Sequence, residues 1–109
     1  MNSRRKGKVG ELEWARFLRE EGFVAARRGV QFQGGPDSPD VVGVQGVHFE
    51  VKRCEILRLY DAMKQAVTEA KPSETPVVVH RRNEEGWLVI LRAEDFVRLL
   101  RVLRNTGGT

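Results

Sequence analysis

The sequence predicts a single α/β domain, in which a mixed five-stranded β-sheet is flanked by α-helices. The chain has 109 residues, which is the size of one compact domain. Hydrophobic residues make up 40% of it, enough for a modest core. Helix-like and strand-like segments follow the order helix, three strands, helix, two strands, helix, which favours an α/β arrangement. We expect one domain over residues 1–109, with a flexible basic tail at 1–6 and a frayed end at 105–109.

In the first half of the chain, apolar periodicity and turn residues set the expected elements. One broad apolar face predicts the first helix, and Gly22 is a natural stop at its C-terminal end. Gln45-Gly46 marks a turn between two β-branched runs, which are expected to pair as a hairpin. The expected elements are a helix at 9–21, a strand at 23–28, a loop at 33–39, and hairpin strands at 41–44 and 47–53.

The second half shows the same two kinds of pattern. Asp61 can cap a helix that runs to about residue 70. Strands are expected at 75–80 and 87–91, with a polar turn between them, and a last amphipathic helix at 93–104. Because both faces of the 87–91 run are apolar, we expect this strand to be covered on both sides.

Charge and composition narrow the classes of partner and compartment. The net charge of +4 and the pI of about 9.7 suit a polyanionic partner, with nucleic acid as the first candidate. No apolar run approaches the roughly 18 residues needed to cross a bilayer, and no apolar stretch follows the basic N-terminus as in a secretory signal. The single cysteine, Cys54, excludes an intrachain disulfide. We therefore expect a cytoplasmic protein without a membrane partner.

The strongest chemical pattern is Pro39-Asp40 followed by Glu50-Val51-Lys52. Side chains alternate along a strand, so His48, Glu50 and Lys52 share one face, opposite the apolar side chains between them. A two-residue turn would pair Asp40 with Val51. A three-residue turn with Gly46 in the left-handed position would place Asp40 opposite Glu50, and we favour that register because it keeps the other face apolar.

Two opposed carboxylates repel each other unless a cation lies between them. Mg²⁺ takes oxygen ligands and keeps several waters, so Asp40, Glu50 and the backbone carbonyl of Val51 would suffice, and Mn²⁺ could substitute. The metal could polarise a phosphodiester and help deprotonate a water. Lys52 could orient that water or stabilise charge on the phosphate. The alternative is an ordinary solvated strand face that carries a Glu-Lys pair.

Glu11 lies at the border of the apolar face of the first helix, beside Trp14. A carboxylate in such a place is unusual unless it is paired or binds a metal. The preceding Lys6-Gly7-Lys8 segment has lysines for phosphate and a glycine that permits close backbone approach. The alternative for Glu11 is an acidic first turn that interacts favourably with the helix dipole.

These motifs together resemble a known family. The pattern Lys6-Gly7-x3-Glu11, Gly22-Phe23-x3-Arg27, Pro39-Asp40 and Glu50-Val51-Lys52 resembles the archaeal-type Holliday junction resolvases of the PD-(D/E)xK nuclease superfamily, which also occur in phages. The resemblance runs from about residue 6 to 92. It implies a restriction-endonuclease-like core and a homodimer that resolves four-way DNA junctions by paired, Mg²⁺-dependent phosphodiester hydrolysis. For a phage member, the compartment would be the host cytoplasm.

The resemblance also implies roles for single residues. Asp40 and Glu50 would bind Mg²⁺, Glu11 would complete the catalytic site, and Lys52 would assist the water. Gln65 would be an auxiliary residue, unless it is simply a solvated helical glutamine. The candidate DNA-binding residues are Arg4, Arg5, Lys6, Lys8, Arg27, Ser38 and Gln65.

Some choices remain open at the level of sequence. Pro36-Asp37 competes with Pro39-Asp40, and we choose Asp40 because it directly opens a strand. His48 and His80 lack the spacing of a metal-binding pair, and we assign neither a catalytic role. The alternatives to a resolvase are another nuclease of the superfamily, of the repair or restriction type, and a non-catalytic DNA-binding module.

Overall fold

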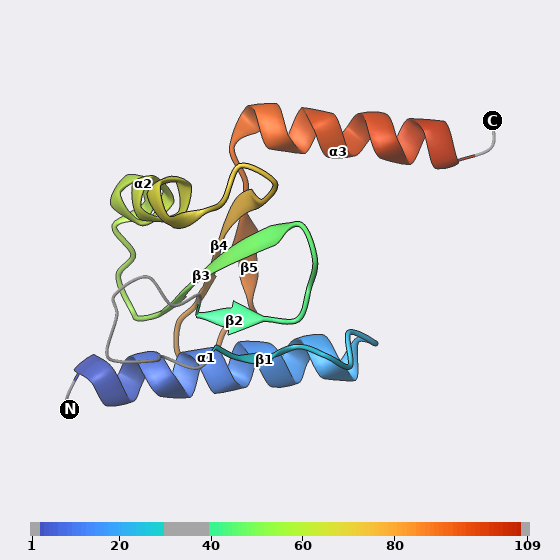
Figure 1. Cartoon of the computed structure of the whole chain (residues 1–109). Coiled ribbons are helices and arrows are strands. Elements are labelled where there is room, and N and C mark those ends of the chain that lie inside the picture. The colour runs from blue at the N-terminus through green and yellow to red at the C-terminus, as the bar shows by residue number, and fades with distance from the viewer. Residues whose placement is uncertain (1–2, 30–39, 108–109) are drawn as a thin grey trace.

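The computed structural model of the protein describes residues 3–29 and 40–107, with side chains from Gly7 onward in the first segment (Figure 1). Helices and strands alternate broadly as the sequence predicts. The elements are α1 (Ser3–Glu20), β1 (Arg27–Arg28), β2 (Val41–Val42), β3 (Val47–Arg53), α2 (Leu59–Glu69), β4 (Thr75–Arg81), β5 (Leu88–Ile90) and α3 (Ala93–Thr106).

The larger sheet has three strands, with β4 in the centre. β3 and β4 run parallel and are joined through α2, because parallel neighbours need a crossover connection. β4 and β5 run antiparallel and pair Val79 with Val89, as the polar turn between them predicts. The α/β fold class and the mixed pairing are therefore confirmed.

β1 and β2 form a separate antiparallel sheet of two strands, which pairs Arg27 with Val42. The expected single five-stranded sheet is therefore wrong: the strands among the described residues divide into two sheets. Gly43 gives a physical reason. Its φ is +97°, and a Cβ atom there would clash with the backbone of Ala25, so glycine lets β2 lie close to the chain that leads into β1.

The predicted hairpin between β2 and β3 is also wrong. Asp40, directly before β2, accepts a hydrogen bond from the backbone N–H of Val51 through Oδ2, at 2.9 Å. The Asp40 side chain thus occupies the edge of β3 at which the backbone of a paired β2 would otherwise form hydrogen bonds. The register that pairs Asp40 with Glu50 across a ladder is not formed, although Asp40 does reach the edge of β3.

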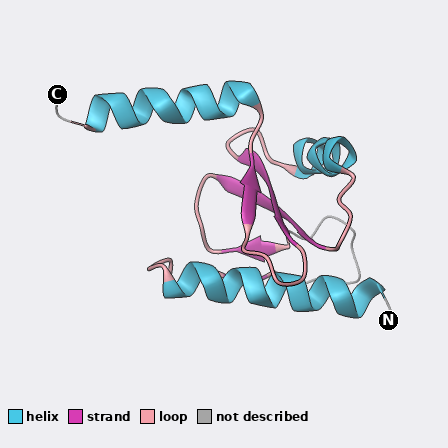
Figure 2. Ribbon diagram, turned by 180° about the vertical axis from the view of Figure 1, so that it is seen from behind, coloured by secondary structure: helices cyan, strands magenta, loops and turns pink. Residues whose placement is uncertain are grey.

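α1 and α2 lie on opposite sides of the three-stranded sheet (Figures 1 and 2). The face toward α1 carries the main hydrophobic core, in which the ring of Trp14 meets Phe49 edge-on at 5.5 Å. The face toward α2 has a smaller apolar cluster around Val78. The main core consists of Trp14, Ala15, Leu18, Ala26, Val41, Phe49, Val51, Val77 and Val79. β3 therefore separates this core from a more polar layer under α2.

Several element boundaries differ from the sequence-based expectation. α1 begins at Ser3, so residues 3–6 of the expected flexible tail have helical backbone, as arginine and lysine favour. α3 continues to Thr106, past the expected frayed start at 105, and ends at Gly107. The strand expected at 23–28 is reduced to Arg27–Arg28, because hydrogen bonds such as Ala26 N–H to the Phe23 carbonyl form turns instead.

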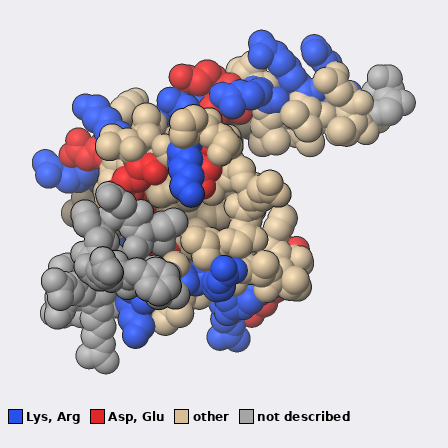
Figure 3. Space-filling view, viewed as in Figure 1, with Lys and Arg blue, Asp and Glu red and all other residues tan. Residues whose placement is uncertain are grey.

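α3 and β5 leave apolar surface uncovered. In β5, Leu88 is 64% exposed, so the prediction that this strand is covered on both sides is wrong. α3 extends away from the body of the molecule, and its visible underside is free of charged side chains (Figures 1 and 3). Among the described residues, no helix has the length and hydropathy needed to cross a membrane.

Candidate functional site

The alternation predicted for β3 is confirmed. Phe49 and Val51 are buried in the core against α1, while His48 and Glu50 lie on the face toward α2. His48 is 4% exposed and Glu50 only 3%. Burial of an ionisable side chain costs free energy unless a partner compensates it, so this pair marks the region as chemically unusual.

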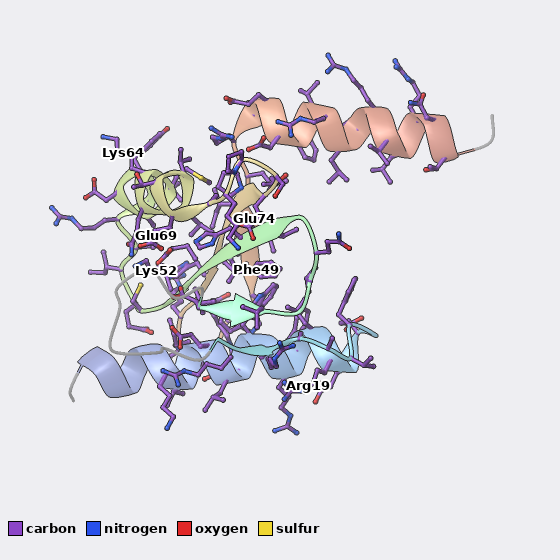
Figure 4. The ribbon with its side chains drawn as sticks, in the orientation of Figure 1. Arg19, Phe49, Lys52, Lys64, Glu69 and Glu74 are labelled. Atoms are coloured by element: carbon purple, nitrogen blue, oxygen red, sulfur yellow. The ribbon has the colours of Figure 1, made fainter. Side chains whose placement is uncertain are left out.

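α2 adds two polar side chains beside this layer, the exposed Gln65 and the partly buried Glu69. Lys52 Nζ donates to Gln65 Oε1 at 3.1 Å and lies 3.5 Å from Glu50 Oε2. Gln65 Nε2 donates to Glu69 Oε1 at 3.4 Å. Figure 4 shows Glu69 and Lys52 between α2 and the sheet. The predicted auxiliary residue Gln65 therefore lies in direct contact with the predicted catalytic lysine.

Asp40 approaches the same group from the free edge of β3. Burial, reinforced by the negative charge of Glu50, raises the pKa of Asp40 to about 6, against the smaller opposing effect of the Val51 hydrogen bond. Asp40 and Glu50 are therefore electrostatic neighbours although their strands do not pair. The surroundings of Asp40 therefore do not fully offset the free-energy cost of burying its negative charge.

The backbone of Val51 faces this edge. The Cys54 N–H donates to the Arg81 carbonyl, which shows that even-numbered residues of β3 point their backbone groups toward β4. Odd-numbered residues point the other way, in agreement with the Val51 N–H bond to Asp40. Because the N–H and C=O of one strand residue face the same edge, the Val51 carbonyl lies on the side that Asp40 covers.

Glu11 is held on α1 by an ion pair that the sequence did not suggest. Arg28 Nε donates to Glu11 Oε1 at 2.7 Å. Burial nevertheless raises the pKa of Glu11, and the nearby charge of Asp40 adds to the effect. The structure thus gathers Glu11, Asp40 and Glu50 around one end of β3. The only sequence signal for Arg28 was its place beside Arg27.

A second convergence lies deeper under α2. His48 Nε2 lies 3.7 Å from Glu50 Oε1 and 3.6 Å from Glu69 Oε2. Among the described residues, only these three form a group of at least three side chains that are close enough together to bind one metal ion. Neither Asp40 nor Glu11 belongs to this group. The adjacent Glu50 carboxylate raises the pKa of His48, despite the opposing effect of burial.

Sequence reasoning missed this group for an identifiable reason. His48 shares a strand face with Glu50, which alternation did indicate, but its spacing to His80 argued against a metal role. Glu69 is twenty-one positions from His48 and carries no motif, so only the packing of α2 on β3 brings it there.

The predicted DNA-binding residues are placed only in part. Arg27 is exposed and donates to the backbone carbonyl of Ala25, two residues earlier, and Lys8 is exposed on α1. Gln65 faces the Lys52 network as described above. For Arg4, Arg5 and Lys6 the backbone alone is described, and Ser38, Pro39 and the competing Asp37 lie outside the described residues. The proposed contacts of these residues with DNA remain predictions.

A cavity of about 320 Å³ opens beside the network and is lined by Lys52, Cys54, Leu57, Arg58, Asp61, Ala62 and Gln65. Because Lys52 lines this cavity, a ligand that enters from solvent could contact its side chain. Comparison with known proteins gives no further guide, because no family model, curated protein or solved structure matches the chain significantly.

Proposed function

We propose that this protein is a metal-dependent DNA endonuclease that resolves four-way junctions as a homodimer. The observation that carries the proposal is the burial of Asp40 beside Glu50, where the pKa of Asp40 rises to about 6 because burial and the Glu50 charge oppose its ionisation. A cation would compensate both carboxylates. The site chemistry therefore fits a bound divalent metal better than a solvated strand face.

The donor set around this edge suits Mg²⁺, with Mn²⁺ as a substitute. Asp40, Glu50 and the Val51 carbonyl are hard oxygen ligands, and Glu11 lies close enough to Asp40 for the charge of Asp40 to raise the pKa of Glu11. When bound there, the metal would polarise a phosphodiester and lower the pKa of a water. Lys52, held by Gln65 and Glu50, would keep a positive charge beside the reacting phosphate.

The β3-α2-β4 crossover supports the finer proposal of a restriction-endonuclease-like core. It presents Glu50 and Lys52 on one strand and covers them with a helix that supplies Gln65. The net charge of +4 favours a DNA substrate. Arg27 and Lys8 are exposed and available for phosphate contacts.

The homodimer proposal rests on α3. Its apolar side chains Phe96, Val97, Leu99, Leu100, Val102 and Leu103 are each 42–57% exposed. An isolated helix of this length is marginal in water, so a partner for its apolar face would stabilise it. Glu94 at its start and Arg104 in its last turn would complement each other in an antiparallel pair. A two-fold dimer would also supply the two cuts that resolution requires.

The test compares a four-way junction with a matched duplex, with Mg²⁺ and with EDTA. Wild-type protein is expected to cut the junction only with Mg²⁺. Asp40→Asn and Lys52→Ala should lose cleavage yet retain junction binding in a gel-shift assay. Lys64→Ala, an exposed lysine on α2, is the matched control and should cut like wild type.

Each outcome of this test bears on a different part of the proposal. Cleavage by Asp40→Asn at the wild-type rate would refute the metal assignment. Equal cleavage of duplex and junction would refute the resolvase function and leave a nuclease of the repair or restriction type. DNA binding without any metal-dependent cleavage would favour a non-catalytic DNA-binding module.

A further inference from the structure

Two buried polar atoms under α2 have no hydrogen-bond partner among the residues that the structure describes. They are His48 Nε2 and Glu50 Oε1, and both side chains are at most 4% exposed. Each lone unsatisfied atom in a protein interior costs free energy, and two that face each other imply a missing common partner. The nuclease site proposed above does not use His48.

The spacing of the donor atoms is too wide for hydrogen bonds and suits ligands of one ion. His48 Nε2 lies 3.7 Å from Glu50 Oε1 and 3.6 Å from Glu69 Oε2. A hydrogen bond between nitrogen and oxygen spans about 2.7–3.2 Å. Two ligands of a tetrahedral ion with bonds of about 2.0–2.1 Å lie roughly 3.3 Å apart, so a shift of a few tenths of an ångström would bring each carboxylate oxygen to that distance from His48 Nε2. The three donor atoms all lie within 4.8 Å of one another.

The other oxygen of each carboxylate is already held by a neighbour. Glu50 Oε2 faces Lys52 Nζ at 3.5 Å, and Glu69 Oε1 accepts from Gln65 Nε2 at 3.4 Å. These contacts turn Oε1 of Glu50 and Oε2 of Glu69 toward the imidazole. Such outer contacts orient the ligands in known metal sites.

From this arrangement, we propose that His48, Glu50 and Glu69 form a binding site for a divalent transition-metal ion such as Zn²⁺. An imidazole nitrogen favours Zn²⁺ or Co²⁺ over Mg²⁺, which takes oxygen ligands. Two carboxylates neutralise the charge of a divalent ion inside the protein. The Glu69 side chain is 23% exposed, so the ion could reach the site from solvent on that side.

This site takes two ligands, His48 and Glu69, that the proposed Mg²⁺ site does not use, and its ion binding does not depend on nuclease activity. The two sites share Glu50, but Asp40 lies at the edge of β3 whereas Glu69 comes from α2. Binding would fasten the last turn of α2 to β3. It would therefore stabilise the folded state by linkage, because the unfolded chain cannot hold the three ligands together.

The experiment measures Zn²⁺ binding by calorimetry on the full chain after removal of metals with a chelator. Co²⁺ provides a second probe, because its visible absorption reports on coordination. We expect one Zn²⁺ per chain, a rise in the melting temperature, and no displacement by equimolar Mg²⁺. Cys54→Ser serves as the background, so that the single thiol cannot supply binding.

Ligand variants assign the site. Glu69→Gln and His48→Gln should each weaken Zn²⁺ binding by about tenfold or more, since even outer-shell changes cost on the order of 10–100-fold. His80→Gln is the matched control, because its imidazole contacts the Cys54 carbonyl instead. Asp40→Asn should retain Zn²⁺ binding, because it removes a neighbouring charge and none of the three ligands. Glu69→Gln keeps the test decisive should His48→Gln fail to fold, because Glu69 is at the rim of the site.

Three results would overturn the proposal. The first is a wild-type chain that binds no Zn²⁺. The second is equal weakening by Glu69→Gln and His80→Gln. The third is loss of binding in Asp40→Asn, which would place the ion at the edge of β3. Failure of Mg²⁺-dependent cleavage alone would refute the nuclease and leave this site standing.

Discussion

Replacing Asp40 by asparagine should make the metal-free protein more stable at pH 7. The pKa of Asp40 rises from its usual 3.8 to about 6, first because of burial and then because of the Glu50 charge. The folded state therefore disfavours the ionised carboxylate. Asparagine removes the charge, and its side-chain oxygen can still accept the hydrogen bond from the Val51 N–H.

The magnitude follows from the two pKa values. Their difference of about two pKa units corresponds to about 3 kcal/mol, at about 1.4 kcal/mol per unit. The Asp40 side chain is only half-buried, so solvent screens part of this effect. A neutral amide also accepts a weaker hydrogen bond than a carboxylate, so about 3 kcal/mol is an upper limit for the gain in stability. A gain of about 1–2 kcal/mol in the free energy of unfolding is expected for Asp40→Asn at pH 7.

The stability difference between Asp40→Asn and wild type should increase as the pH rises. Because the pKa is higher in the folded state, ionisation of Asp40 costs no stability below about pH 3.8, where both states are protonated. The cost grows as pH rises toward 6 and is complete above it. The advantage of Asp40→Asn over wild type should therefore be full at pH 7 and shrink as the pH falls toward 4.

Urea unfolding in EDTA at pH 7 and at pH 4.5 measures both effects. Asp61→Asn is the matched control, because Asp61 is exposed on α2, and it should show no comparable gain. Added Mg²⁺ should stabilise wild type and not Asp40→Asn. A variant that is less stable than wild type at pH 7, or a gain that is the same at both pH values, would refute the reasoning.

Three further predictions test the packing, the DNA surface and the dimer. Gly10→Ala should destabilise the fold by about 1–3 kcal/mol in thermal unfolding, because the new Cβ would lie 2.6 Å from that of Arg53. At Gly7 a new Cβ would meet no atom of the described residues within 4 Å, so Gly7→Ala should be neutral or slightly stabilising. Equal effects would contradict the packing of α1 on β3. Arg27→Ala should weaken DNA binding regardless of sequence and flatten its salt dependence by roughly one unit, and an unchanged slope would remove Arg27 from the DNA surface. Leu100→Glu should convert a dimer to a monomer in analytical ultracentrifugation, and an unaltered dimer would exclude the α3 face as its interface.

The parts of the fold that follow local rules were predictable. β3 spans residues 47–53 as expected, because its alternation of apolar and polar side chains matches its two environments. The polar turn before β5 likewise gives the antiparallel pair β4–β5. The partner of β2 was not predictable in this way. It depends on the close approach of Gly43 to Ala25 and on a side chain that occupies the strand edge, and both are tertiary effects.

The site shows the same division. The Pro39-Asp40 and Glu50-Val51-Lys52 motifs led to Asp40, Glu50 and Lys52, which the structure places around one end of β3. The predicted pairing of Asp40 with Glu50 in a strand register was wrong. Asp40 instead contacts β3 through a hydrogen bond from the Val51 N–H to its side chain. Residues from separate elements, such as Arg28 and Glu69, escaped detection because no local pattern marks them.

Glu50 connects the two proposed metal sites, and the chemistry of its neighbours decides what each site would take. Toward the edge of β3, its neighbour is another carboxylate, Asp40, and the available ligands are oxygens, which suit Mg²⁺. Toward α2, its neighbour is the imidazole of His48, whose Nε2 has no hydrogen-bond partner among the described residues and favours a softer ion. One buried carboxylate thus faces two donor sets of different hardness. Glu50 contributes the same charge to both sites, so its charge does not distinguish the two ions. The imidazole nitrogen discriminates against Mg²⁺, and selectivity between the ions would therefore come from the type of ligand.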